Sequence, residues 1–159
     1  MTGSPAVGSA RLVLLCGLPG SGKTTTARRI AEETGGVRFC PDEWMTTLAI
    51  DLFDEAARAR VEALQWELSQ QLLVLGQTVI IEWGVWARAE RDAVRERGRE
   101  LGARVELVYL EVPIDVLLQR LEVRNREQPS GTAVISRENL LSWVGLFEAP
   151  DAEEQSRFD

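Results

Sequence analysis

Short apolar runs alternate along the chain with longer stretches that have the character of helices. Continuous apolar runs are typical of strands buried on both faces, and four occur, at Leu12–Cys16, Val37–Cys40, Thr78–Ile81 and Val105–Leu110. The stretches of helical character are Gly22–Glu33, Pro41–Ile50, Asp54–Leu75, Ala87–Leu101, Ile114–Arg126 and Ser136–Phe147. Because strands alternate with helices, we predict a three-layer α/β fold with a parallel sheet of four to five strands flanked by helices.

Two of the helical stretches allow a prediction of which side chains are buried. In residues 54–75 the apolar stripe, which should face the core, consists of Val61, Leu64, Leu68, Leu72 and Leu75. In residues 87–101 glutamates are interleaved with arginines, and this mixture predicts a solvated helix. Those arginines are Arg88, Arg91, Arg95, Arg97 and Arg99.

The chain has 159 residues, about the length of one domain. We predict a flexible leader at 1–10, a single domain at 11–147 with a mobile lid at about 126–136, and an acidic C-terminal tail at 148–159. No apolar run is long enough to span a membrane, and the first residues lack a signal-peptide pattern. We therefore expect no membrane partner and a cytoplasmic location, and no pattern indicates an oligomeric state.

The loop after the first apolar run fits the Walker A pattern of glycine, four residues, glycine, lysine and serine or threonine. Its glycines let successive backbone N–H groups point at phosphate oxygens, and the following helix adds its positive end. Lys23 can bridge the β- and γ-phosphates, and the Thr24 hydroxyl can ligate Mg²⁺. We predict a site for ATP and Mg²⁺ formed by Gly17, Leu18, Pro19, Gly20, Ser21, Gly22, Lys23, Thr24 and Thr25.

The composition narrows the chemistry that this loop can serve. Lys23 is the one lysine beside seventeen arginines, which excludes the lysine-containing guanine-reading loop of GTPases. The chain has no histidine, so Ser/His and Cys/His triads are excluded and a general base must be a carboxylate or another group. The net charge of −7 argues against a protein that binds nucleic acid mainly by neutralising phosphates. Cys16 and Cys40 are interpreted as buried or half-buried free thiols.

With this P-loop and this order of elements, residues 11–147 resemble the small P-loop kinases. That family includes the kinase domain of bacteriophage polynucleotide kinase, chloramphenicol phosphotransferase, zeta toxins, gluconate and shikimate kinases, and adenylate kinase. The resemblance implies a P-loop NTPase fold with a lid, and transfer of the γ-phosphoryl group of ATP to a hydroxyl. In the family an Asp at the end of the second strand takes the proton of that hydroxyl, and the similar segment Phe39–Glu43 carries this role onto Asp42.

The resemblance also assigns arginines of the helix before the lid. In the similar kinases one arginine stacks on adenine and a second, one turn later, stabilises the transferring phosphoryl group. Arg120 and Arg124 have this spacing and are assigned to ATP, with Arg124 catalytic, and Arg126 is assigned to the substrate. The alternative is a solvated face in which Glu122 and Glu127 pair with these arginines.

Carboxylates and tryptophans follow the second and third apolar runs, whose carboxyl ends should face one crevice. We predict that Asp42, the favoured base, and Glu82 lie on the acceptor side. Asp42 could instead be a helix N-cap. Glu82 could hold Mg²⁺ through water, orient the substrate, act as the base, or form a structural ion pair. Three tryptophans could contact the acceptor or pack in the core: Trp44, Trp83 and Trp86. The remaining two, Trp66 and Trp143, are interpreted as packing residues.

Taken together, the sequence predicts an ATP-dependent phosphotransferase that acts on a hydroxyl of a small molecule, such as a sugar, a nucleoside or an antibiotic. One alternative is a 5′-hydroxyl polynucleotide kinase, against which the net acidity weighs. Another is a nucleotide-binding regulator or weak ATPase. The presence of Lys23, Asp42 and Arg124 favours catalysis, because a binding module needs neither a base nor a lid.

Overall fold

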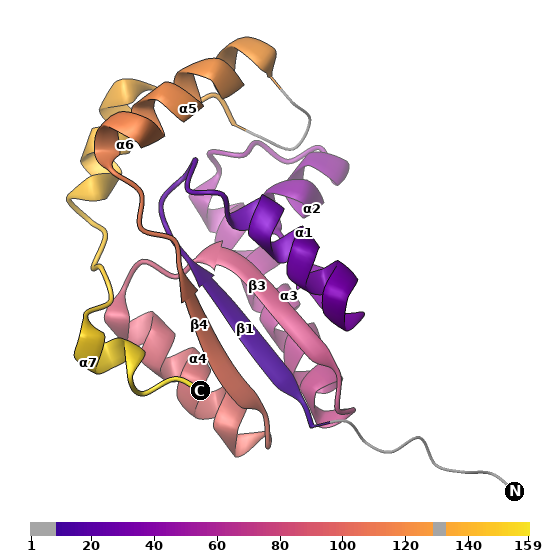
Figure 1. Cartoon of the computed structure of the whole chain (residues 1–159). Coiled ribbons are helices and arrows are strands. Elements are labelled where there is room, and N and C mark those ends of the chain that lie inside the picture. Colours follow the sequence, from indigo (N-terminus) through magenta and orange to yellow (C-terminus); the bar gives the residue numbers. More distant parts are fainter. Residues whose placement is uncertain (1–8, 129–132) are drawn as a thin grey trace, which may run out of the picture.

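A parallel sheet of four strands forms the centre of the protein (Figure 1) in the computed structural model, which describes residues 9–128 and 133–159. The strands lie in the order β2-β3-β1-β4, and all three neighbouring pairs are parallel. Their bounds are Arg11–Cys16 for β1, Val37–Phe39 for β2, Thr78–Gly84 for β3 and Arg104–Tyr109 for β4. This sheet confirms the predicted α/β class.

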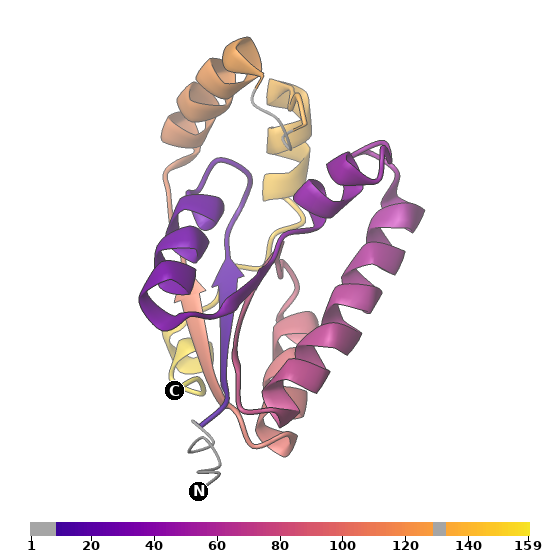
Figure 2. The same ribbon diagram turned by 90° about the vertical axis from the view of Figure 1, so that its right-hand side faces the viewer.

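Helices cover both faces of the sheet, and α5 and α6 lie beyond the carboxyl ends of its strands (Figures 1 and 2). In Figure 2, α1 stands on one side of β1, and α3 and α4 stand on the other. The helices are α1 (Lys23–Thr34), α2 (Pro41–Thr47), α3 (Glu55–Val74), α4 (Arg88–Glu100), α5 (Ile114–Glu127), α6 (Arg137–Val144) and α7 (Ala152–Gln155). The three predicted layers are therefore present.

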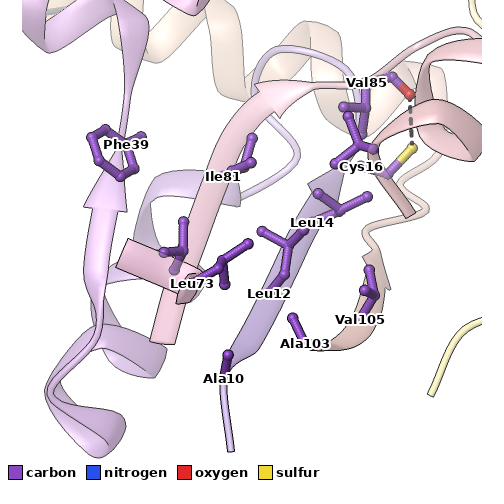
Figure 3. Packing of buried hydrophobic residues seen from close by; sticks show 12 residues of the cluster. Ala10, Leu12, Leu14, Cys16, Phe39, Leu73, Ile81, Val85, Ala103 and Val105 are labelled. Atoms are coloured by element: carbon purple, nitrogen blue, oxygen red, sulfur yellow. Dashed lines mark hydrogen bonds between the residues drawn. The ribbon is translucent and has the colours of Figure 1, made fainter. Parts of the chain in front are cut away.

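Strand β1 is apolar on every side because it contributes to two cores. Leu12, Leu14 and Cys16 point to the face shared with Leu73 of α3 (Figure 3), and Val94 of α4 belongs to the same buried cluster. The alternate residues of β1, Val13 and Leu15, pack against Ala27 and Ile30 of α1. Since successive side chains of a strand point to opposite faces, a central strand covered on both faces reads as one continuous apolar run.

The predicted buried stripe of α3 is only partly correct. Val61 is buried and Leu68 and Leu72 pack partly against the core, but Leu64 and Leu75 are 49% and 67% exposed. The residues of α3 that are buried are Ala57, Val61, Gln65, Ser69 and Leu73, one every fourth position. The side-chain oxygen of Gln65 accepts a hydrogen bond from the Trp83 indole at 2.9 Å, while its side-chain nitrogen has no partner among the described residues. A polar side chain with such a partner can replace a leucine on a buried face.

The prediction of a solvated helix holds in α4 for Arg97 and Arg99, which are exposed, but was wrong for Arg91 and Arg95. Its buried residues are Arg91, Val94, Arg95 and Gly98, which recur at the spacing of one helical face. A Cβ atom at Gly98 would lie 2.9 Å from side-chain atoms of both Leu12 and Val105, so glycine lets α4 approach the sheet closely. The long arginine stems provide the apolar cover that this face needs.

The segment 148–159, expected to be a tail, packs along the protein beside α4 and β4 (Figure 1). Glu154 of α7 is 1% exposed, and Phe158 packs against the core and lies 5.3 Å from the guanidinium carbon of Arg95. Asp159 pairs with the backbone of Val105, donating its N–H to the carbonyl at 2.8 Å. These twelve residues are thus held by charged, aromatic and backbone contacts.

Both cysteines are buried free thiols, as predicted, and burial raises the pKa of each to about 11. Within residues 9–128 and 133–159, no helix is long and apolar enough to cross a membrane. The leader at 1–10 lies almost wholly outside the described residues, as do residues 129–132 at the centre of the expected lid.

Candidate functional site

The P-loop, Gly17–Thr24, connects the end of β1 to the first turn of α1. Its backbone needs glycine at defined places: Gly20 and Gly22 have φ of 83° and 96°, and Gly22 is the N-cap of α1. A Cβ atom at Gly17 would lie 2.5 Å from the Ser21 hydroxyl, so the turn cannot close around a larger residue. The result is a tight loop that directs the N-terminus of α1 at the cleft, as anion binding requires.

Lys23 is folded back onto the loop that carries it. Its ammonium donates to the carbonyls of Gly17 at 2.9 Å and Leu18 at 3.0 Å. Burial lowers the pKa of Lys23 to about 8, while the nearby charges of Glu82 and Asp42 oppose this shift. A desolvated cation beside a phosphate-binding loop is stabilised further by phosphate oxygens, so this geometry suits an anionic ligand.

Thr24 and Glu82 are joined directly. The Thr24 hydroxyl donates to Oε1 of Glu82 at 2.7 Å, and the other carboxylate oxygen accepts from Arg38 of β2. Arg38 also makes two bonds to Glu43, at 2.8 and 2.7 Å, so it connects β2, β3 and α2. A hydroxyl beside a buried carboxylate is a donor set that suits a hard cation such as Mg²⁺. Thr24 and Glu82 are therefore the residues that could hold it.

Asp42 lies in the first turn of α2, which begins at Pro41 and has Cys40 as its N-cap. The alternative prediction that Asp42 caps this helix is therefore wrong. Oδ1 of Asp42 lies 2.6 Å from a guanidinium nitrogen of Arg58 on α3. This oxygen is buried and accepts no hydrogen bond among the described residues, so Arg58 is an ion-pair partner of Asp42, and one that the sequence analysis did not foresee.

A cleft of about 790 Å³ brings most of the predicted site residues together. The α1 and α5 side contributes cations, namely Lys23, Arg28, Arg120 and Arg124. The α2, α3 and β3 side contributes mainly carboxylates, among them Asp42, Glu55, Glu62 and Glu82, and Glu90 of α4 adds another. Pro19, Gly20, Gly22, Thr24 and Thr25 also line this cleft, whereas Ser21 lies buried beneath it. The cationic wall of the cleft thus suits phosphates, whereas the carboxylate-rich wall does not.

The three arginines of α5 have different surroundings. Arg120 donates to the carbonyl of Gly20 at 3.2 Å and so reaches the P-loop. Arg124 lines the cleft with its Nε buried and without a hydrogen-bond partner among the described residues, and burial lowers its pKa. Arg126 instead pairs with Glu122 at 2.9 Å, with its side chain 70% exposed, and does not line the cleft. The structure therefore places the first two arginines at the site and the third outside it.

The base of the expected lid is closed by a residue that the sequence analysis did not single out. Asn125 of α5 donates to the carbonyl of Ile135 at 2.6 Å and accepts from its N–H at 3.0 Å. These paired bonds join the two ends of the segment that contains residues 129–132. An asparagine near the end of a charged helix gives no sequence signal for such a contact.

The tryptophans divide between the cleft and the core. Trp83 and Trp86 line the cleft, and Trp86 is joined there by Trp143, whose ring centroid lies 5.9 Å away. Trp44 packs against Phe39 with centroids 5.9 Å apart and does not line the cleft. Trp66 packs edge-on against Trp83, as expected of a packing residue. Trp143 was interpreted as packing alone, but it also contributes to the cleft wall.

Glu62 of α3 is a further cleft residue that the sequence reading passed over. Burial, together with the negative charge of Glu90, raises the pKa of Glu62 to about 7. Arg58 and Glu62 lie one helical turn apart, so one face of α3 presents both to the cleft. The spacing of Arg58 and Glu62 is present in the sequence, but the prediction for this helix rested on the leucine stripe, which contains other residues.

A protein-family model described as an AAA domain matches residues 12–150 of the chain. No curated protein matches the chain. The family match covers the strands, the P-loop and helices α1 to α6.

Solved structures with this fold include a gluconokinase from Sinorhizobium meliloti 1021, 21% identical with a TM-score of 0.62 over 93% of this chain and 81% of that chain. A sugar kinase from Janibacter sp. HTCC2649 is 27% identical, with a TM-score of 0.64 over 91% and 82% of the two chains. A chain of the Pnkp1/Rnl/Hen1 RNA repair complex is 23% identical, with a TM-score of 0.73 over 96% of this chain but 47% of that chain. The shared fold is that of small P-loop kinases.

Proposed function

The chain belongs to the AAA-domain family that matches residues 12–150, with the fold of small P-loop kinases, and on this premise we propose that it is an ATP-dependent phosphotransferase acting on a hydroxyl of a small molecule. The observation that carries the proposal is the cleft in which Lys23, Asp42 and Arg124 meet. A nucleotide-binding module would need the first of these, but not a carboxylate and a second, half-buried cation in the same cleft.

At the nucleotide side, the P-loop N–H groups and the ammonium of Lys23 bind the phosphates. Lys23 exchanges its bonds to the carbonyls of Gly17 and Leu18 for phosphate oxygens, which restores the partners of a desolvated cation. Mg²⁺, where bound, would be held by Thr24 and, through water, by Glu82, and it would supply neutralisation of phosphate charge. Arg124 stabilises the charge that spreads over the transferring phosphoryl group.

At the acceptor side, Asp42 accepts the proton of the attacking hydroxyl. Its Oδ1 is buried and lies 2.6 Å from a guanidinium nitrogen of Arg58, so Oδ2 is the oxygen that we assign to the acceptor. Glu82 is less suited to this role because both of its oxygens already accept hydrogen bonds, one from Thr24 and one from Arg38. The assignment of Asp42 as base therefore follows from which carboxylate has an oxygen to offer.

The charge of the acceptor wall favours a neutral or amine-bearing molecule. Glu55, Glu62 and Glu90 line it, and the one guanidinium that α3 contributes, Arg58, is already in contact with Asp42. Like charges facing each other across a binding surface cost affinity, so a polyanion would be disfavoured here. Trp83 and Trp86 add ring surfaces of the kind that bind sugars and other cyclic molecules. The competing hypothesis is a 5′-hydroxyl polynucleotide kinase, and it is supported by the structural similarity to a chain of an RNA repair complex.

The proposal is tested by incubating the protein with γ-labelled ATP and a panel of acceptors. The panel contains neutral sugars, nucleosides, aminoglycosides, sugar acids and 5′-hydroxyl oligonucleotides. We expect label on a neutral or amine-bearing compound. Label on an oligonucleotide alone would favour the polynucleotide kinase, and accumulation of ADP with no labelled acceptor would favour a weak ATPase.

A further inference from the structure

A fully buried arginine outside the cleft connects the C-terminal segment to the loop between β3 and α4. Arg91 of α4 is 0% exposed, and its guanidinium meets the Glu154 carboxylate of α7 at 2.5 and 3.0 Å. Burying two charges is favourable only where the geometry is good and the remaining polar groups are satisfied. Nothing in the proposed chemistry uses this pair, so its position in the fold calls for another explanation.

The remaining N–H groups of Arg91 hold backbone carbonyls of two segments. Nη1 donates to Val85 at 2.8 Å and to Trp86 at 3.0 Å, and Nη2 donates to Glu148 at 2.8 Å. Glu148 in turn donates its N–H to the Trp86 carbonyl at 3.0 Å. The β3–α4 loop is therefore fastened from one side by Arg91 and from the other by the C-terminal segment.

This loop has a conformation that needs to be held. Val85 is a β-branched residue with φ of 41°, in the left-handed region that such residues rarely adopt, and Gly84 before it has φ of 87°. The carbonyl of Val85 also accepts a bond from the Cys16 thiol at 3.6 Å (Figure 3). A strained backbone persists only where its surroundings over-determine it, and Arg91 and Cys16 provide those contacts.

The loop reaches the nucleotide site through two contacts with the first P-loop residue. The N–H of Gly17 donates to the Gly84 carbonyl at 3.3 Å, and the Trp86 indole N–H donates to the Gly17 carbonyl at 3.3 Å. That same carbonyl accepts from the Lys23 ammonium. The position of the β3–α4 loop thus affects the position of the Gly17 carbonyl, to which the Lys23 ammonium donates.

We propose that Arg91 is a positioning residue for the nucleotide site, and that Glu154 and the segment 148–159 belong to the catalytic unit because they fix Arg91. The inference rests on the proposed function only in that the P-loop binds a nucleotide. It adds that nucleotide affinity depends on α7, a helix that lies outside the family match.

The test is nucleotide affinity and thermal stability measured side by side, with ADP and Mg²⁺ and no acceptor. The double variant R91M/E154M replaces a buried ion pair by apolar side chains, a change that is often neutral or stabilising in proteins. It removes the bonds to Val85, Trp86 and Glu148. We expect a melting temperature close to that of the wild type and an ADP affinity about tenfold weaker, the loss that one poorly placed hydrogen bond produces.

Coupling to Trp86 separates positioning from a merely structural role. If Arg91 acts through Trp86, then W86F should weaken ADP binding, and adding W86F to R91M/E154M should cause less additional loss than W86F causes alone. The matched control is R88A/E153A, which removes an exposed ion pair of 2.7 Å between the same two segments and should leave affinity unchanged.

Wild-type ADP affinity in R91M/E154M, or fully additive effects with W86F, would overturn the proposal. If the double variant does not fold, W86F alone decides, since unchanged ADP affinity in that variant removes the link between the loop and the site. Failure of every acceptor in the labelling panel would leave this measurement unaffected, because no phosphoryl transfer is involved.

Discussion

The two sides of the cleft are built in different ways. The nucleotide side is formed mostly by one continuous segment, in which backbone groups of the P-loop and the ammonium of Lys23 satisfy one another at 2.9 and 3.0 Å. The acceptor side is assembled from side chains of α2, α3, β3 and α4, which are far apart in sequence. A local segment can be recognised as a motif, whereas a wall assembled from distant helices depends on how each helix is turned.

The two sides also differ in the charge that they present. Lys23, Arg120 and Arg124 give the nucleotide side cations that phosphates would neutralise. Glu62 on the acceptor side carries a carboxyl whose pKa is raised to about 7 by burial and by the charge of Glu90, so its ionisation at neutral pH is opposed. On each side, the free protein thus carries an electrostatic cost that a ligand of opposite charge would reduce, which is a common property of preorganised sites.

Removing the cation of the nucleotide side should have the largest effect. K23A takes away the group that contacts both the loop and the phosphates, and we expect kcat/KM for ATP to fall by about 1000-fold, with weaker nucleotide binding. Steady-state kinetics and calorimetric titration with ADP would measure the two effects. R29A, which removes an exposed cation of the same helix paired with Glu33, should change neither quantity. Equal losses in both variants would contradict a specific role for Lys23.

Removing the base of the acceptor side should affect turnover and not nucleotide affinity. D42N keeps the size of the side chain but removes proton acceptance, and we expect kcat to fall by about 100-fold or more while the affinity for ADP stays unchanged. The comparison variant is E43Q, the next residue on α2, whose carboxylate is held by Arg38 and should not take up a proton. If D42N lost nucleotide binding as well, Asp42 would act through its contact with Arg58, as a structural residue.

The lid arginines allow a test within one helix. R124A removes a partly buried cation that faces Asp42 across the cleft, and we expect kcat to fall on the order of 30-fold, since a hydrogen bond to a charged group contributes roughly 2 kcal/mol. R126A removes an exposed cation paired with Glu122, two residues further along, and should leave kcat as it is. Matching effects in the two variants would show that α5 contributes general positive charge and no directed contact.

The same contrast explains how much could be read from the sequence. The strands, their order with the helices and the whole P-loop were predictable, because continuous apolar runs and a glycine-rich motif are local signals. Asp42 and Glu82 followed from their place at strand ends, where parallel strands open onto a common edge. Arg58 and Glu62 were missed because their importance depends on the rotation of α3, which the leucine stripe indicated only approximately.

The buried charges were the other residues that the sequence did not reveal. Arg91 and Arg95 were interpreted as solvated because glutamates are interleaved with the arginines of this helix, yet their spacing with Val94 and Gly98 is that of a buried helical face. What makes the burial of Arg91 favourable is Glu154, which is 63 residues away in sequence. A pairing over that distance has no local pattern, so only the fold brings it into view.

The smallest expected effect is on stability, and it should come from Glu62, the acceptor-side carboxyl whose ionisation the protein opposes. The pKa of Glu62 rises from its ordinary 4.5 to about 7 on folding, so between these pH values the unfolded chain releases a proton that the folded chain keeps. Stability therefore falls as pH rises through this window, and the full cost is present above pH 7. E62Q removes that cost, and after allowance for solvent screening we expect a gain of about 1 kcal/mol at high pH and almost none at low pH.

Urea unfolding of the wild type and E62Q at about pH 4.5 and about pH 8 measures this difference directly, with the protein free of ligand. E67Q, which changes an exposed glutamate of the same helix, should show no comparable gain at the higher pH. A gain in the stability of E62Q that is equal at both pH values would trace the effect to packing instead of charge. The claim that the acceptor wall opposes the ionisation of Glu62 would then be wrong. A gain confined to the higher pH would mean that the free protein sacrifices stability to keep a carboxylate where an acceptor binds.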